Sequence, residues 1–179
     1  SNELYCAHTN PSPVFHSDGS VTLAFNAGFC HNHLETIGIA QAPHWSGPYT
    51  LLDDEAVLRT TDDTPHHCED PFLWQDERGW HLLVHNQQGP QGSSAYAFSV
   101  DAQNWTLSPN TPYNCTVTFT DGTTVEAEGC GNRPQLVFTD SAAAGGPPKL
   151  LINGAQAAKP NGGKGTWTLF RKISQTHNI

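Results

Sequence analysis

Two stretches of the sequence repeat one pattern and decide the fold class. The first is Pro11–Asn26, PSPVFHSDGSVTLAFN, and the second is Pro71–Asn86, PFLWQDERGWHLLVHN. Their first proline, central glycine and final asparagine align without gaps at an offset of 60 positions. A third copy begins at Pro134 and resumes at Lys149, after an insertion rich in Gly, Pro and Ala. Repetition at a fixed period of this order is typical of arrays of supersecondary units.

Each copy has the pattern of a β-hairpin. A short apolar strand follows the proline, which needs no ladder donor at the entry of a strand. In the first two copies a polar turn then ends at Gly19 or Gly79, where glycine can adopt a positive φ. A second hairpin is predicted within 37–52 and within 95–107, whereas the third copy keeps one further strand at 166–171.

Four antiparallel strands per repeat form the blade of a β-propeller. We therefore predict an all-β fold with three blades, formed by repeats at roughly 1–63, 64–125 and 126–179. A β-sandwich or jelly roll with accidental internal similarity is the alternative. Because a propeller closes with about 4–8 blades, we expect missing N-terminal blades or a second chain to complete the ring.

Charge and hydropathy narrow the class of partner. The chain has a formal net charge of −9 with only eight Lys and Arg residues. Nucleic acids and anionic lipids require clustered cations, so both are disfavoured as partners. No apolar stretch is long enough to span a membrane. A neutral partner such as a carbohydrate remains compatible with this composition.

Two N-glycosylation sequons occur, at Asn104 and Asn114. The chain also contains five cysteines and no methionine. Cysteine-rich, loop-rich chains with sequons are typical of oxidising compartments. We therefore expect a secreted, extracellular glycoprotein.

The five cysteines suggest two disulfides. Cys115 and Cys130 flank a predicted hairpin, which makes them the favoured pair. Cys6 and Cys30 flank the first hairpin in a similar way, and Cys68 is then left over. Spacing alone does not fix the connectivity, and an odd count leaves at least one cysteine unpaired or paired elsewhere.

Five short motifs resemble those of the five-bladed propeller glycosidases, broadly those like glycoside hydrolase family 43. They are EDPFLW at 69–74, NRPQLVF at 132–138, IGIA at 37–40, GPY at 47–49 and WTL at 167–169. The resemblance implies that the chain contributes the three C-terminal blades of a five-bladed ring. It also implies that a sugar binds over the central channel.

The resemblance further implies three carboxylates from different blades: an Asp base, an Asp that tunes the acid, and a Glu acid, as in inverting hydrolysis. Asp70, which precedes Pro71, matches the tuning Asp. Asn132 or Arg133 stands where the acid is expected, and Asn10 occupies the comparable position of the first copy. The set is incomplete, so the sequence leaves enzymatic activity open.

Other residues are candidates for contacts with a sugar. Glu128 is the nearest substitute acid, although a solvated loop glutamate is the simpler interpretation. Trp74 is predicted to stack on a sugar, and Asn132 and Arg133 are predicted to bind substrate. His85 is predicted either to line the channel or to lie at the surface. By default, tryptophans pack in the core or between blades; the five are Trp45, Trp74, Trp80, Trp105 and Trp167.

Two histidine clusters are candidate metal ligands. His66, His67 and Cys68 are adjacent in sequence, unlike the spaced ligands of zinc sites. His31 and His33 have strand-like spacing, but loop polarity explains them equally well. No glycine-rich phosphate loop is present. We predict neither a metal nor a cofactor.

Together these patterns predict a secreted, glycosidase-like propeller that recognises or processes carbohydrate at its central channel, with Asp70 at the centre. The alternative is a non-catalytic structural glycoprotein of an extracellular assembly. That alternative uses unpaired strand edges and an odd cysteine to join neighbouring molecules.

Overall fold

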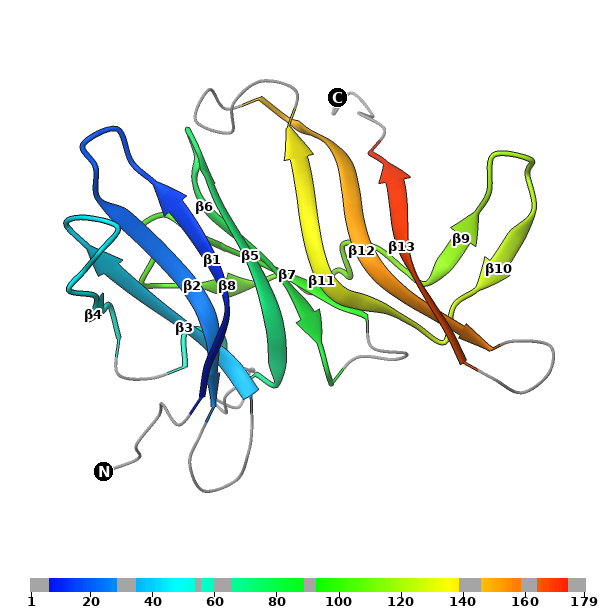
Figure 1. Cartoon of the computed structure of the whole chain (residues 1–179), viewed down its shortest axis with the longest axis horizontal. Coiled ribbons are helices and arrows are strands. Elements are labelled where there is room, and N and C mark those ends of the chain that lie inside the picture. Colours follow the sequence, from blue (N-terminus) through cyan, green and yellow to red (C-terminus); the bar gives the residue numbers. More distant parts are fainter. Residues whose placement is uncertain are drawn as a thin grey trace.

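The computed structural model describes residues 7–28, 35–53, 56–59, 66–88, 93–138, 146–158 and 164–173. Every regular element in these ranges is a β-strand, and all four sheets are antiparallel (Figure 1). No helix in the described part of the chain could cross a membrane. The predicted all-β class is therefore confirmed.

The first two sheets have the four strands expected of a propeller blade, each in the order of the sequence. Blade 1 consists of β1 (Ala7–Phe15), β2 (Val21–Gly28), β3 (Glu35–Ala42) and β4 (Thr50–Leu51). Blade 2 consists of β5 (Cys68–Asp76), β6 (Gly79–Asn86), β7 (Ser94–Ser99) and β8 (Thr106–Leu107).

The third sheet has three strands among the described residues, and a separate hairpin precedes it. The sheet consists of β11 (Gly129–Phe138), β12 (Pro148–Ala158) and β13 (Lys164–Lys172). The hairpin consists of β9 (Thr116–Thr118) and β10 (Thr124–Glu126). Figure 1 shows the three larger sheets arranged as a fan that does not close into a ring.

Glycine forms the predicted hairpin turns. Gly19 between β1 and β2 has a φ of 88°, and Gly79, the first residue of β6, has a φ of 145°. A Cβ at Gly79 would lie 2.5 Å from the backbone oxygen of Ser99. Both the left-handed backbone and the close approach of β7 therefore require glycine at this position.

Blades 1 and 2 share one apolar core. The inward faces of β2 and β3 meet those of β5, β6 and β7, and Ile37, Ile39 and Leu82 are completely buried. Ile37 and Ile39 lie on the same face of β3, as the two-residue period of a strand requires. β2 and β3 are buried on their other face as well, where Phe25, Ala27 and Ala40 form a separate cluster.

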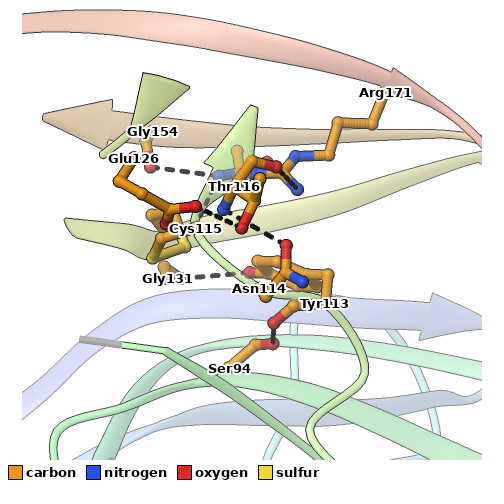
Figure 2. The surroundings of a disulfide bond; sticks show 11 residues. Ser94, Tyr113, Asn114, Cys115, Thr116, Glu126, Gly131, Gly154 and Arg171 are labelled. Carbon is orange, nitrogen blue, oxygen red and sulfur yellow. Dashed lines mark hydrogen bonds between the residues drawn. A yellow bond between two sulfur atoms is a disulfide. The ribbon is translucent and has the colours of Figure 1, made fainter. Parts of the chain in front are cut away.

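A disulfide joins Cys115, which precedes β9, to Cys130 in β11, as predicted (Figure 2). Next to it, the Tyr113 hydroxyl donates to the Gly131 carbonyl at 3.4 Å, and Ser94 of blade 2 donates to the Tyr113 carbonyl at 3.4 Å. This segment links the third sheet to blade 2. The proposed partners Cys6 and Cys30 lie outside the described residues.

Candidate functional site

The inner strands β1, β5 and β11 share an uncommon backbone feature. Three of the four non-glycine residues with left-handed φ in the described chain are Asn10 (51°), Asp70 (54°) and Arg133 (49°). Each directly precedes a proline and lies at a break in strand register. Such a conformation costs on the order of 1–3 kcal/mol and clusters at functional sites. The three repeats thus carry the same strained bulge.

Asp70 connects all three inner strands. Its side chain is buried, with 6% relative exposure. Oδ1 accepts a hydrogen bond from Asn10 Nδ2 at 2.5 Å, and Oδ2 accepts one from the Arg133 backbone N–H at 3.0 Å. The Asp70 backbone N–H donates to Asn26 Oδ1 at 2.7 Å. One carboxylate therefore joins two sheets that flank its own.

A small hollow opens where these three bulges meet. It has a volume of about 180 Å³ and is lined by Asn10, Pro11, Asp70, Pro71, Arg133 and Gln135. A larger hollow of about 940 Å³ runs between the same strands and shares Pro11 and Gln135 with the first. We call the two hollows together the axial groove. The larger hollow alone is near the upper end of the roughly 300–1,000 Å³ that is typical of small-molecule sites.

Glu69 is a second carboxyl group beside Asp70. Its Oε1 lies 2.9 Å from His85 Nδ1, across the β5–β6 ladder. Burial raises the pKa of Glu69, and the nearby Asp70 charge raises it further, while the hydrogen bond from His85 opposes both effects. Two neighbouring carboxyl groups in different environments are typical of acid and base assignments. The sequence placed Glu69 next to Asp70 but did not indicate its partner.

These residues also form the one group of three candidate metal ligands within the described part of the chain. Donor atoms of Glu69, Asp70 and His85 lie within 4.8 Å of one another. However, the Asp70 oxygens already accept hydrogen bonds, and Glu69 is paired with His85. A cation here would have to displace those contacts. The arrangement therefore suits hydrogen-bonding and proton-carrying roles better.

Trp74 lies farther along β5 than the bulge at Asp70. Its ring stacks on that of His81, with centroids 4.8 Å apart and planes 9° apart. It lines the larger hollow of the axial groove and also a cavity of about 740 Å³ between blade 2 and the third sheet, with Tyr96 and Phe138. Trp74 does not line the small hollow that contains Asp70.

The remaining candidates lie around the groove or away from it. Arg133 has a side chain that is 78% exposed, with Nε 3.9 Å from Asp70 Oδ1. Asn132 is exposed next to it. Glu128 is also exposed, and its backbone N–H donates to the Gln156 carbonyl at 2.7 Å. The exposure of Glu128 agrees with a solvated loop residue more than with a buried acid.

Asn26 is a residue that sequence analysis did not assign to the site. It is buried at the end of the first repeat hairpin and binds the backbone of Asp70 in the next blade. The repeat alignment marked this asparagine as recurring. A polar residue that recurs at the end of an otherwise apolar strand is the sequence signal that could have assigned Asn26 to the site.

The two sequon asparagines are accessible. Asn104 and Asn114 are both exposed. The Asn104 amide donates to Asp101 at 2.8 Å, and Asn114 accepts a hydrogen bond from the Thr116 backbone N–H at 3.2 Å (Figure 2). Their geometry is compatible with glycosylation, which remains a prediction, as does secretion.

Cys68 is completely buried, and its thiol donates to the His66 carbonyl at 3.4 Å. Burial strongly raises the pKa of this thiol. Buried, protonated thiols are unreactive. Cys68 is therefore unable to form a disulfide with another molecule while this part of the chain is folded.

The fold resembles solved structures of glycoside hydrolases. Fructan 1-exohydrolase IIa from Cichorium intybus aligns with a TM-score of 0.60 and 13% identity, over 98% of this chain and 32% of that protein. A second similar structure comes from the GH130 family of mannoside phosphorylases, which is described as containing glycoside hydrolases that target β-1,2 mannosidic linkages in Candida mannan. It aligns with a TM-score of 0.53 and 17% identity, over 96% of this chain and 52% of that protein.

A family 117 glycoside hydrolase from the marine bacterium Zobellia galactanivorans aligns with a TM-score of 0.52 and 12% identity, over 92% of this chain and 59% of that protein. The sequence matches no protein-family model and no curated protein. The predicted resemblance to propeller glycosidases is thus confirmed for the fold. The chain spans about one third to three fifths of the length of these structures.

Proposed function

We propose that this chain forms the part of a glycosidase-like propeller that recognises carbohydrate in the axial groove, with Asp70 as its central residue. One observation carries the proposal: the Asp70 carboxylate receives hydrogen bonds from Asn10 and from Arg133, so three sheets converge on one hollow. The likeness in fold to glycoside hydrolases supports the class of ligand.

The chemistry of the hollow suits sugar hydroxyls. An amide from Asn10, a carboxylate from Asp70 and an exposed guanidinium from Arg133 provide both donors and acceptors. Specificity in such sites depends on a few placed polar groups beside apolar walls, and Pro11 and Pro71 provide apolar surface. The net charge of −9 favours a neutral ligand over a polyanion.

Processing of the bound sugar would assign a role to Glu69. A general acid must hold its proton near the working pH, and the raised pKa of Glu69 favours its protonated form. Hydrolysis also needs a group that activates water. Asp70 is the nearest carboxylate and is already bonded on both oxygens. Recognition is therefore the function that this chain supports by its own residues, and the acid role of Glu69 is secondary.

The alternative of a structural glycoprotein joined through an odd cysteine needs a thiol that can reach another molecule. Cys68 does not meet this need, because it has 0% relative exposure and its thiol is bonded to its own chain. The likeness in fold to glycoside hydrolases favours carbohydrate recognition over this alternative.

Isothermal titration with neutral oligosaccharides tests the proposal. Wild type, Asp70→Asn and Arg133→Ala are compared, with Asp121→Asn as the matched control because Asp121 lies exposed in the β9–β10 turn. We expect Asp70→Asn and Arg133→Ala to lose at least about tenfold in affinity, equivalent to 1.4 kcal/mol, and Asp121→Asn to bind normally.

Thermal unfolding of each variant separates loss of binding from loss of fold. Arg133 is useful here because its side chain is mostly exposed, so its truncation should leave the fold intact. Wild-type affinity in both the Asp70 and Arg133 variants would exclude the axial groove as the site.

A further inference from the structure

Trp45 and Tyr49 are unusually exposed aromatic side chains. They lie in the connection between β3 and β4, and their relative exposures are 65% and 43%. The default expectation of core packing is therefore wrong for Trp45, although Trp80 is buried and Trp105 and Trp167 pack against clusters. Large exposed aromatic residues that cluster on a surface indicate interaction sites.

Hydrogen bonds within the connection hold its backbone and the Tyr49 ring in place. The Gly47 N–H donates to the His44 carbonyl at 2.9 Å, and the Tyr49 hydroxyl donates to the Trp45 carbonyl at 2.9 Å. His44 Nδ1 also lies 2.8 Å from Ser46 Oγ. A segment fixed by its own bonds presents the rings with little ordering cost on binding.

A shallow hollow of about 380 Å³ adjoins the same connection. It is lined by Ser20, Val21, Thr22, Gln41, Ala42, Pro43 and Thr50. Of its polar side chains, those of Gln41 and Thr50 are exposed, whereas Thr22 is buried and accepts a hydrogen bond from Gln41 at 3.2 Å. None of its lining residues is charged. Pro43 begins the aromatic connection and Thr50 directly follows it, and both line the hollow. An aromatic surface thus borders uncharged hydrogen-bonding groups.

We propose that Trp45, Tyr49 and the adjoining hollow form a second carbohydrate-binding site, which takes neutral polysaccharide chains. A pyranose or furanose ring has an apolar C–H face, which fits a flat aromatic ring, and hydroxyl edges, which fit Ser, Thr and Gln side chains. The lack of charge in the hollow fits a neutral chain, and the net charge of −9 disfavours anionic ones.

The second site is distinct from the small hollow around Asp70, with which it shares no lining residue. It adjoins the far end of the larger hollow of the axial groove, because His16, which lines that hollow, has its Nε2 3.0 Å from Thr22 Oγ1. The proposal therefore does not depend on the function proposed for Asp70.

Affinity electrophoresis through gels that contain xylan, mannan, inulin or starch tests this site. We expect at least one polysaccharide to retard the wild-type chain, and Trp45→Ala and Tyr49→Ala to lose most of that retardation. Phe170→Ala is the matched control, because Phe170 is an aromatic residue of the third sheet with 62% exposure. Its retardation should equal that of wild type.

Asp70→Asn distinguishes the two sites. Retardation that survives Asp70→Asn but not Trp45→Ala supports the second site, even if the axial groove binds nothing. Wild-type retardation in both the Trp45 and Tyr49 variants, or no retardation of wild type by any of the four polysaccharides, would overturn the proposal.

Discussion

Blade 2 contacts a sheet on each side, and the two interfaces are built differently. Toward blade 1, aliphatic side chains such as Ile39 and Leu82 are completely buried in one shared core. Toward the third sheet, a cavity of about 740 Å³ remains, bordered by Trp74 and Leu151. There the Arg133 backbone N–H donates to Asp70, and Ser94 donates to the Tyr113 carbonyl of the segment that the disulfide ties to β11 (Figure 2).

The interface with blade 1 contributes stability, whereas the interface with the third sheet leaves space that a ligand can reach. The stabilisation by apolar burial scales with the area removed from water. A ligand that had to separate the buried surfaces would lose that stabilisation. Polar connections can hold two sheets together while leaving space between them. The axial groove, which contacts both interfaces, therefore has one rigid side and one open side.

The largest expected effect is the loss of core packing between blades 1 and 2. Leu82→Ala should lower the free energy of unfolding by about 3–5 kcal/mol, because the site is completely buried and would leave a cavity. Leu151→Ala is the matched control and should cost less, because Leu151 already borders a cavity. Urea denaturation measures both; an equal or larger cost for Leu151 would contradict the comparison.

Removing the disulfide should have the next largest effect. Cys115 and Cys130 are separated by 15 positions, and closing a loop of that length stabilises by roughly 3 kcal/mol in the chain-entropy model. The double variant Cys115→Ala/Cys130→Ala should therefore unfold at lower denaturant concentration. If its stability equals that of wild type, the third sheet is held mainly by packing, contrary to this account.

A smaller effect is expected at the bulge on β1. Asn10→Ala removes the amide that donates to the Asp70 carboxylate and places alanine at a φ of 51°. Hydrogen bonds to charged groups contribute about 1.5–3 kcal/mol, so a loss of about 2 kcal/mol is expected. Asn110→Ala, at an exposed position, serves as the control. Equal stability of the two variants would argue against a structural role for the Asn10–Asp70 bond.

The smallest effect concerns pH. Because the pKa of Glu69 is raised in the folded state, the folded chain holds a proton that the unfolded chain releases above about pH 4.5. Stability therefore falls as the pH rises from the unfolded pKa through the folded one. Glu69→Gln removes this loss of stability. The Tm of the variant minus the Tm of wild type should therefore be larger at pH 7 than at pH 4, by about 2 °C or less.

Differential scanning fluorimetry at the two pH values measures this difference. His85→Gln is a useful companion, because it removes the ring that opposes the upward shift. A Tm difference between wild type and Glu69→Gln that does not change with pH would show that Glu69 titrates as an exposed carboxyl group.

The local part of the fold was predictable from sequence. Hairpins β1–β2, β5–β6 and β9–β10 were identified because turn glycines and the short apolar runs that flank them are signals within a few positions. The Cys115–Cys130 pair was identified for the same reason. The cavity beside Trp74 was not, because the fit between two sheets depends on side chains far apart in sequence.

The candidate site was predictable only in part. The motif around Asp70 marked a carboxylate, but its bonds to Asn10 and Arg133 join residues about sixty positions apart. Those bonds depend on left-handed bulges before proline, which no polarity pattern reveals. The exposure of Trp45 was missed because residue type alone favours packing for tryptophan.

A crystal structure of the chain soaked with the oligosaccharide of highest affinity tests the central claim most directly. The account predicts sugar density in the axial groove, with a hydroxyl oxygen within about 2.7–3.2 Å of a polar atom of Asn10, Asp70 or Arg133. Density confined to other surfaces, with the groove around Asp70 free of sugar, would contradict it.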